Sequence, residues 1–251
     1  MAKKKIIKWE PDNFELETKT IWSFPDRGDW ATHDGNYRGN WSPYVPRNLI
    51  LRYSKPGDLV LDQFAGGGTT LVEAKLLKRN IIGIDVNPAA LQRCREKCDF
   101  DYDSSSKVYV KQGDARKLEF IPDKSIDFIC THPPYADIIK YSNDVTNDIS
   151  HFSEKEFLEA MEKVAKESFR VLKDKKYCAV LMGDIRRKQH VIPLSFQVMQ
   201  VFQRAGFTVK EIIIKEQHNC KSTDRWKERS EKYNFLMLAH EYLFVFERGN
   251  L

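Results

Sequence analysis

The fold is decided by the stretch Asp62-Gln63-Phe64-Ala65-Gly66-Gly67-Gly68-Thr69-Thr70. It follows the apolar run 59–61 and precedes the helically spaced segment 71–77, so the predicted order is strand, glycine turn, helix. That order presents backbone N–H groups at a helix N-terminus, and the absence of Cβ atoms lets a ligand approach the main chain closely. A glycine turn alone is a weak signal, because some such turns are only tight strand-to-helix corners.

The next strand ends in an acidic residue. The run 81–84 is apolar, and Asp85 follows it about 20 residues after the turn, where an acidic side chain can bind ribose hydroxyls. A dinucleotide site needs the spacing G-x-G-x-x-G, which this chain lacks. The pattern instead resembles the S-adenosylmethionine motif of the DNA amino-methyltransferases, which methylate adenine N6 or cytosine N4. The resemblance implies that Asp62, Phe64, Ala65, Gly66, Gly67, Gly68, Thr69 and Thr70 form the loop around the methionine part of the cofactor, and that Asp85 holds its ribose.

Three further segments complete the predicted cofactor site. Asn87 precedes Pro88 and is placed to cap the following helix. The resemblance implies that Asp114 and Ala115 contact the adenine of the cofactor, although an ordinary acidic turn explains them equally well. A helix led by proline precedes the glycine turn, and the resemblance implies that its first residues touch the methionine moiety. Those residues are Pro46, Arg47 and Asn48.

The segment that carries the chemistry is His132-Pro133-Pro134-Tyr135, directly after the predicted strand 125–130. The two prolines stiffen the chain as it leaves the sheet. An exocyclic amine is a poor nucleophile because its lone pair is delocalised into the ring, and acceptors aimed at its protons make that lone pair available. The resembling family places Asp, Asn or Ser before Pro-Pro-Tyr; that side chain and the first proline's carbonyl are the acceptors, and the tyrosine stacks on a base flipped out of the duplex.

His132 departs from the family pattern. A neutral imidazole has one acceptor nitrogen, whereas an imidazolium has none. The sequence therefore predicts a rate that falls on acidification through the pKa of this histidine. The departure also leaves adenine N6 and cytosine N4 both open as the target.

Composition sets the outer limits. A chain of 251 residues with 41% hydrophobic and 31% charged residues is most simply one domain, 1–251, with an irregular, aromatic-rich strap over 1–45. No apolar run reaches the roughly 20 residues of a membrane span, and five scattered cysteines without a C-x-x-C pair predict free thiols, no metal and a cytoplasmic location.

The net charge of +5 permits nucleic-acid binding without demanding it. We expect double-stranded DNA as the partner. No segment has the size of a separate target-recognition domain, so recognition falls to loops, to the strap, to a homodimer partner, or to a separate specificity or restriction subunit. The candidate contacts, which a solvated surface explains equally well, are Lys140, Tyr141, Arg186, Arg187, Lys221, Arg225 and Trp226.

The predicted fold is α/β, a doubly wound, mostly parallel, seven-stranded Rossmann-like methyltransferase sheet with an antiparallel closing strand. Because the cofactor motif precedes the catalytic one, the chain looks circularly permuted relative to the class whose glycine motif it resembles. The predicted function is methyl transfer from S-adenosylmethionine to a DNA amine. Two alternatives stay open: a methyltransferase acting on RNA guanine N2 or protein glutamine, and a non-catalytic DNA-binding subunit of a modification complex.

Overall fold

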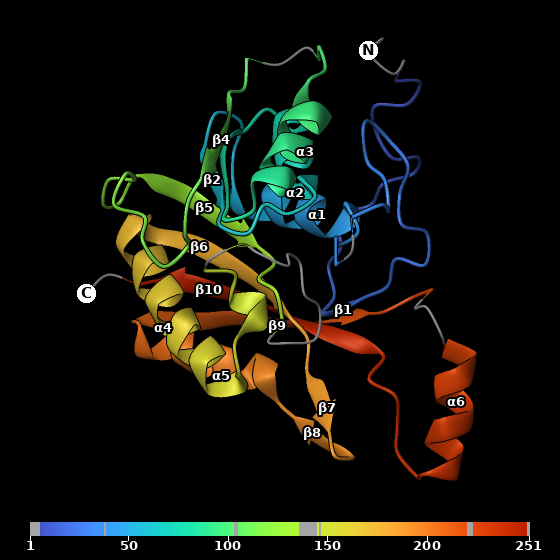
Figure 1. The fold of residues 1–251 in the computed structure, drawn as a ribbon. Helices are drawn as coiled ribbons and strands as arrows, with labels where there is room; N and C mark the ends of the chain where they lie inside the picture. The colour runs from blue at the N-terminus through green and yellow to red at the C-terminus, as the bar shows by residue number, and fades with distance from the viewer. Residues whose placement is uncertain are drawn as a thin grey trace.

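The sheet at the centre of the molecule has eight strands in the order β1-β9-β10-β6-β5-β2-β3-β4 (Figure 1). The computed structural model describes residues 6–37, 39–102, 105–135, 145, 147–219 and 223–249, without the side chains of 223–225. β10 is antiparallel to its neighbours β6 and β9, and the other pairings are parallel. The strands are β1 (Ile21–Trp22), β2 (Leu59–Asp62), β3 (Asn80–Asp85), β4 (Val108–Gln112), β5 (Ile126–Thr131), β6 (Leu172–Met182), β9 (Phe207–Glu216) and β10 (His240–Arg248).

Helices cover both faces of the sheet, as predicted for a doubly wound fold. One face packs against α1 (Tyr44–Tyr53), α2 (Thr69–Leu76) and α3 (Pro88–Cys98), and the other against α4 (Glu154–Val171) and α5 (Leu194–Arg204). Successive side chains of a strand point to opposite faces, so Val180 of β6 packs with α4 and α5, whereas its neighbour Leu181 packs in the core on the α1–α3 side.

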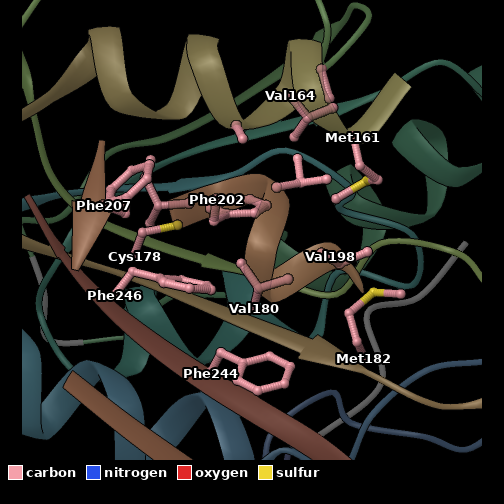
Figure 2. Close-up of a cluster of buried hydrophobic side chains, with 14 of the residues drawn as sticks. Met161, Val164, Cys178, Val180, Met182, Val198, Phe202, Phe207, Phe244 and Phe246 are labelled. Atoms are coloured by element: carbon pink, nitrogen blue, oxygen red, sulfur yellow. The ribbon is translucent and has the colours of Figure 1, made fainter. Parts of the chain in front are cut away.

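Aliphatic, sulfur-containing and phenylalanine side chains fill the core between the sheet and helices α4 and α5 (Figure 2). Phe202 of α5 stacks on Phe246 of β10 with ring centroids 4.9 Å apart, and Phe207 packs on both. Ser153 caps the N-terminus of α4 through a capping box with Glu156. This core holds the carboxyl edge of the sheet rigid behind the site.

The prediction of seven strands was wrong, because the strap over 1–45 contributes an eighth. β1 adds to the edge strand β9 in parallel, and the Ile214 backbone N–H donates to the Thr20 carbonyl at 2.8 Å. A strand of two residues is too short to show alternating hydrophobicity in the sequence. β1 forms because the edge strand β9 offers unpaired backbone groups to it.

The segments that carry the candidate nucleic-acid contacts also contain regular secondary structure. Residues after β6 form a hairpin of β7 (Ile185–Arg187) and β8 (His190–Ile192), and the polar stretch after β9 contains α6 (Thr223–Lys232). Figure 1 shows both beyond the carboxyl end of the sheet, away from the packed helices. A single 3₁₀ turn, η1 (Ile149–His151), precedes α4.

The winding of the sheet reverses between β2 and β5. From β2 the chain runs outward through β3 to β4, and from β5 it runs outward in the opposite direction to β6. In sheets of this kind ligands bind outside the carboxyl ends of the strands at such a switch point. Asp62 ends β2 and Thr131 ends β5, which places both predicted motifs at the same point.

Over the part of the chain that the structure describes, no helix is long and apolar enough to cross a membrane. Cys94, Cys98, Cys130 and Cys178 are buried free thiols, as predicted. Cys220 falls outside the described ranges.

Candidate active site

A pocket with about 810 Å³ of empty space, partly open to solvent, lies at the carboxyl ends of β2, β3, β4 and β5. Its walls come from the glycine turn, from the residues after β3, β4 and β5, from the strap and from the segment before α4. The lining residues are Tyr37, Gly39, Asn40, Trp41, Asp62, Gln63, Phe64, Ala65, Gly66, Gly67, Asp85, Val86, Asn87, Gly113, Asp114, Ala115, Arg116, His132, Pro134, Asn147, Asp148, Ile149 and Val164.

The Asp85 carboxylate ties two walls of the pocket together. Its Oδ2 accepts from the Gly66 backbone N–H and its Oδ1 from that of Asn87, both at 2.9 Å. Burial raises the pKa of Asp85 above its usual value, and these two hydrogen bonds act against the rise. Each carboxylate oxygen has a further lone pair, so Asp85 can accept from ligand hydroxyls without releasing the turn. The Asn87 side chain caps α3 by accepting from the Ala89 N–H, as predicted.

Asp62 joins the two strands at the switch point. It is 2% exposed, and its Oδ1 accepts from the Thr131 hydroxyl at 2.8 Å and from the Phe64 N–H at 3.1 Å. Burial raises the pKa of Asp62 to about 6, although hydrogen bonds from threonine side chains oppose the rise. The cofactor turn and the catalytic segment are therefore fixed relative to each other.

The strap closes the pocket over the glycine turn. Thr69 donates its hydroxyl to Asn40 Oδ1 at 2.5 Å. A Cβ added at Gly67 would lie 2.9 Å from Tyr37 Cβ, so this glycine is required for the close approach of the strap.

The His132 ring forms one wall of the pocket. It stacks on Trp41 with ring centroids 5.4 Å apart and an interplanar angle of 27°. Its Nε2 lies 2.9 Å from the Tyr135 hydroxyl, which donates to Glu241 Oε1 at 2.6 Å. Burial lowers the pKa of His132 to about 4; the nearby Glu241 carboxylate raises it and the Lys215 ammonium lowers it. The imidazole is therefore neutral at pH 7.

The structure brings most of the predicted site residues into one place. Pro133, Tyr135, Gly68, Thr69 and Thr70 lie behind the lining and support it, whereas the other residues of the two motifs, with Asn87, Asp114 and Ala115, line the pocket. Asp114 is also held by Arg116, whose guanidinium makes contacts of 2.9 Å and 2.6 Å with its two oxygens.

The residues predicted at the start of the proline-led helix do not line the pocket. Arg47 is buried in an ion pair with Glu73 at 3.0 Å, and the Asn48 side chain accepts from the Glu17 N–H at 2.7 Å. Arg47, which also donates to Glu10, and Asn48 therefore anchor the strap, whereas Pro46 is buried in the same helix. The strap residues Asn40 and Trp41 line the pocket instead.

Sequence reasoning missed the residues that reach the site from distant strands. Glu241 of β10 and Lys215 of β9 pair at 2.9 Å beneath Tyr135. No local pattern identifies them, because their meeting depends on the antiparallel register of β9 with β10, in which Glu241 is opposite Lys215. The strap residues had a signal, since their aromatic-rich, aperiodic segment needs a surface on which to pack.

The predicted nucleic-acid contacts are scattered. The Arg186 guanidinium donates to the carbonyls of Gln189 and Leu236, which ties the β7–β8 hairpin to the segment after α6. Arg187 is exposed, and Trp226 on α6 is 48% exposed. Lys140, Tyr141 and Lys221 lie outside the described residues, as does the side chain of Arg225.

A family model described as DNA methylase matches residues 2–96 and 126–250. The chain belongs to the N6/N4 DNA methylase family. A general methyltransferase-domain model also matches residues 60–175. Together these matches show that the chain contains a methyltransferase domain, whose cofactor is S-adenosylmethionine, and the pocket lies within that domain.

Curated relatives resemble parts of the chain. A tRNA (guanine(10)-N2)-dimethyltransferase of Methanothermobacter thermautotrophicus is 34% identical over 101 residues, 40% of this chain and 29% of that protein. The type II methyltransferase M.BglI of Bacillus subtilis is 31% identical over 114 residues, 42% of this chain and 33% of that protein. Each match therefore spans a third or less of the relative's length.

Solved structures support the fold. TrmN from Thermus thermophilus superposes with a TM-score of 0.56 at 20% identity, covering 84% of this chain and 50% of that one. An S-adenosylmethionine-dependent methyltransferase from Methanosarcina mazei gives 0.57 at 14% identity, covering 81% and 98%. The chain thus has the Rossmann-like methyltransferase fold.

The low pKa of His132 predicts an acid-tolerant chemical step. We expect kcat, measured with cofactor and substrate saturating, to stay level as pH falls from 8 to about 5 and to halve near the pKa of about 4, rather than near the ordinary value of 6.5. The unfolded chain takes up this proton at higher pH than the folded protein, so His132 lowers stability as pH falls from 6.5 towards 4. Circular dichroism at each pH checks that the enzyme is folded, and a kcat that halves near 6.5 contradicts the expectation.

A second prediction concerns Gly183, which follows β6. A Cβ there would lie 2.8 Å from Tyr135 Cε2, in the body of a ring rather than at a flexible end. Gly183→Ala should therefore displace Tyr135 and lower kcat by about tenfold, while the cofactor Kd changes less than about twofold, because the glycine is not part of the pocket lining. Gly57→Ala provides a control, since nothing lies within 4 Å of its Cβ position, although its φ of +86° predicts some loss of stability. Equal kcat values for the two variants contradict the prediction that the position of Tyr135 controls the chemical step.

Proposed function

We propose that the protein transfers a methyl group from S-adenosylmethionine to the exocyclic amine, adenine N6 or cytosine N4, of a base flipped out of duplex DNA. The observation that carries the proposal is His132, a neutral side-chain acceptor in the wall of the same pocket as the cofactor turn. The family assignment supports DNA as the substrate, and type II DNA methyltransferases are among the relatives.

In this proposal the protein contributes binding and orientation. The bound cofactor supplies an electrophilic methyl group on its sulfur. The glycine turn and Asp85 hold its methionine and ribose parts, and Asp114 receives its adenine. His132 accepts a hydrogen bond from one of the amine protons, which frees the nitrogen lone pair for attack. Tyr135 and Trp41 hold the imidazole in place.

Two candidate DNA contacts lie on elements that follow the carboxyl ends of strands, at the edge of the sheet where the pocket lies. The hairpin β7–β8 and helix α6 follow the carboxyl ends of β6 and β9 and carry Arg187 and Trp226. Phosphate contact by a cation and base stacking on an exposed aromatic ring are the two interactions that such elements provide. Target recognition would be completed by a second copy of the chain or by a separate subunit.

A second candidate is methylation of guanine N2 in RNA, which is favoured by the similarity to tRNA (guanine(10)-N2)-dimethyltransferases. One assay distinguishes methylation of DNA from methylation of RNA. The purified protein is given cofactor with a tritiated methyl group and either plasmid DNA, bulk RNA or a protein extract. We expect incorporation into DNA, and mass spectrometry of the nucleosides then identifies the methylated base. Incorporation into RNA or protein alone would falsify the DNA assignment, and tight cofactor binding without transfer to any acceptor favours a binding subunit.

A further inference from the structure

A chain of hydrogen bonds runs from the wall of the pocket into the sheet. It begins at His132 Nε2, passes through the Tyr135 hydroxyl to Glu241, and ends at Lys215 Nζ, with contacts of 2.9, 2.6 and 2.9 Å. Glu241 is 7% exposed, and neither it nor Lys215 lines the pocket. Its two carboxylate oxygens are used by different partners, Oε1 by Tyr135 and Oε2 by Lys215.

The direction of each of these three hydrogen bonds follows from the ion pair between Glu241 and Lys215. Lys215 can only donate, and ionised Glu241 can only accept. Burial acts to raise the pKa of Glu241, but attraction to Lys215 and the hydrogen bonds from Tyr135 and Lys215 outweigh burial and hold it below the ordinary value. The Tyr135 proton is therefore committed to Glu241, and the short O–H···O contact is typical of a charge-assisted bond.

The hydrogen bond between Tyr135 and His132 then has only one possible direction. With its proton on the side of Glu241, the Tyr135 oxygen faces His132 as an acceptor, so Nε2 must carry the imidazole proton. A neutral imidazole has a single N–H, which leaves Nδ1 unprotonated. His132 lines the pocket, whereas Tyr135, the partner of its Nε2, does not. Since Nε2 is engaged by Tyr135, Nδ1 is the ring nitrogen left for a molecule in the pocket.

We propose that Glu241 and Lys215 are positioning residues that act through Tyr135 to hold His132 as the Nε2–H tautomer, with Nδ1 as the acceptor for the target amine. The inference rests on the proposed function for its consequence, but the tautomer itself is independent of the substrate. A donor at Nδ1 would face the N–H groups of the amine and oppose its approach. The distant ion pair thus decides whether His132 can replace the acceptor that the family usually takes from Asp, Asn or Ser.

Glu241→Gln keeps the shape of the side chain but reverses the direction of the hydrogen bonds that run through Tyr135 to His132. Because Lys215 only donates, the glutamine oxygen must face Lys215, and the amide N–H₂ then faces Tyr135. The Tyr135 oxygen accepts from that amide and turns its own proton to His132 Nε2, so the histidine proton moves to Nδ1. Glu247→Gln is the matched control, since Glu247 lies on the same strand and pairs with Lys210 at 4.0 Å, away from the pocket.

The experiment is ¹⁵N NMR of the histidine rings, with the His132 signals assigned by their absence from His132→Ala. In the wild-type protein at pH 7 we expect Nδ1 unprotonated and Nε2 protonated, and in Glu241→Gln the reverse. kcat should fall about 10²-fold in Glu241→Gln, with the cofactor Kd within about twofold and no change in Glu247→Gln. A protonated Nδ1 in the wild-type protein, or an unchanged tautomer in folded Glu241→Gln, overturns the inference.

The two proposals fail in different ways. If the tautomer is as expected but no nucleic acid is methylated, the positioning role stands and the proposed function is wrong. If DNA is methylated while the wild-type Nδ1 carries the proton, the function stands and the positioning role is wrong. Should Glu241→Gln not fold, the wild-type spectrum still decides the question.

Discussion

His132→Ala is expected to lower kcat by a factor on the order of 10²–10³ while the cofactor Kd stays within about twofold. The substitution removes the acceptor that activates the amine, and the cofactor contacts at the glycine turn and Asp85 stay in place. Single-turnover methyl transfer measures the chemical step, and calorimetric titration with S-adenosylmethionine measures the affinity. A cofactor Kd that rises as much as kcat falls would place His132 in cofactor binding instead.

Two further variants sharpen this test. His132→Asn restores a side-chain acceptor of the type that the resembling family uses, so it should recover part of the activity that His132→Ala loses. His218→Ala removes a histidine outside the pocket lining, whose Nε2 lies 2.9 Å from the Ser23 hydroxyl, and should leave both constants unchanged. If alanine and asparagine at position 132 are equally active, an acceptor there is not what the reaction requires.

Local sequence patterns predicted the elements that bind through their own backbone. The run from Asp62 to Thr70 and the acidic end of β3 were identifiable because strand, turn and helix succeed one another within the reach of one motif. Arg47 was misplaced for a physical reason: its position at a helix start fits both a ligand contact and a buried ion pair, and only the fold brings Glu73 next to it.

The support behind His132 could not be predicted at all. Glu241 is more than a hundred residues from Tyr135, and the two meet because β10 inserts antiparallel between β6 and β9. The strand pattern of β10 shows which residues face which side but not which strand lies next to it. Contacts of this kind depend on which strands are neighbours, so the structure is needed to identify the residues that support His132.

Asp85→Asn is expected to weaken cofactor binding by about 10- to 100-fold, which corresponds to a loss of about 1.5–3 kcal/mol in hydrogen bonds to a charged group. The asparagine keeps one acceptor oxygen and presents an N–H₂ group where the second oxygen was. That group must face the N–H of either Gly66 or Asn87, so one of the two bonds that shape the pocket is replaced by two opposed donors. At saturating cofactor, kcat should change only a few-fold, because Asp85 does not contact the amine.

Asp127→Asn separates this effect from a general loss of stability. Asp127 is also largely buried and also accepts from a backbone N–H, that of Leu59 at 3.0 Å, but it lies near the amino ends of β5 and β2, at the edge of the sheet opposite the pocket. Both variants should lower the melting temperature. Asp85→Asn loses an acceptor for a backbone N–H, and Asp127→Asn loses either the acceptor for the Leu59 N–H or the one for the Lys173 ammonium, which lies 2.8 Å from Oδ1. Only Asp85→Asn should raise the cofactor Kd, because only its carboxylate connects the glycine turn to the start of α3. If Asp127→Asn weakens cofactor binding as strongly, the affinity reflects the stability of the whole sheet rather than the contacts of Asp85.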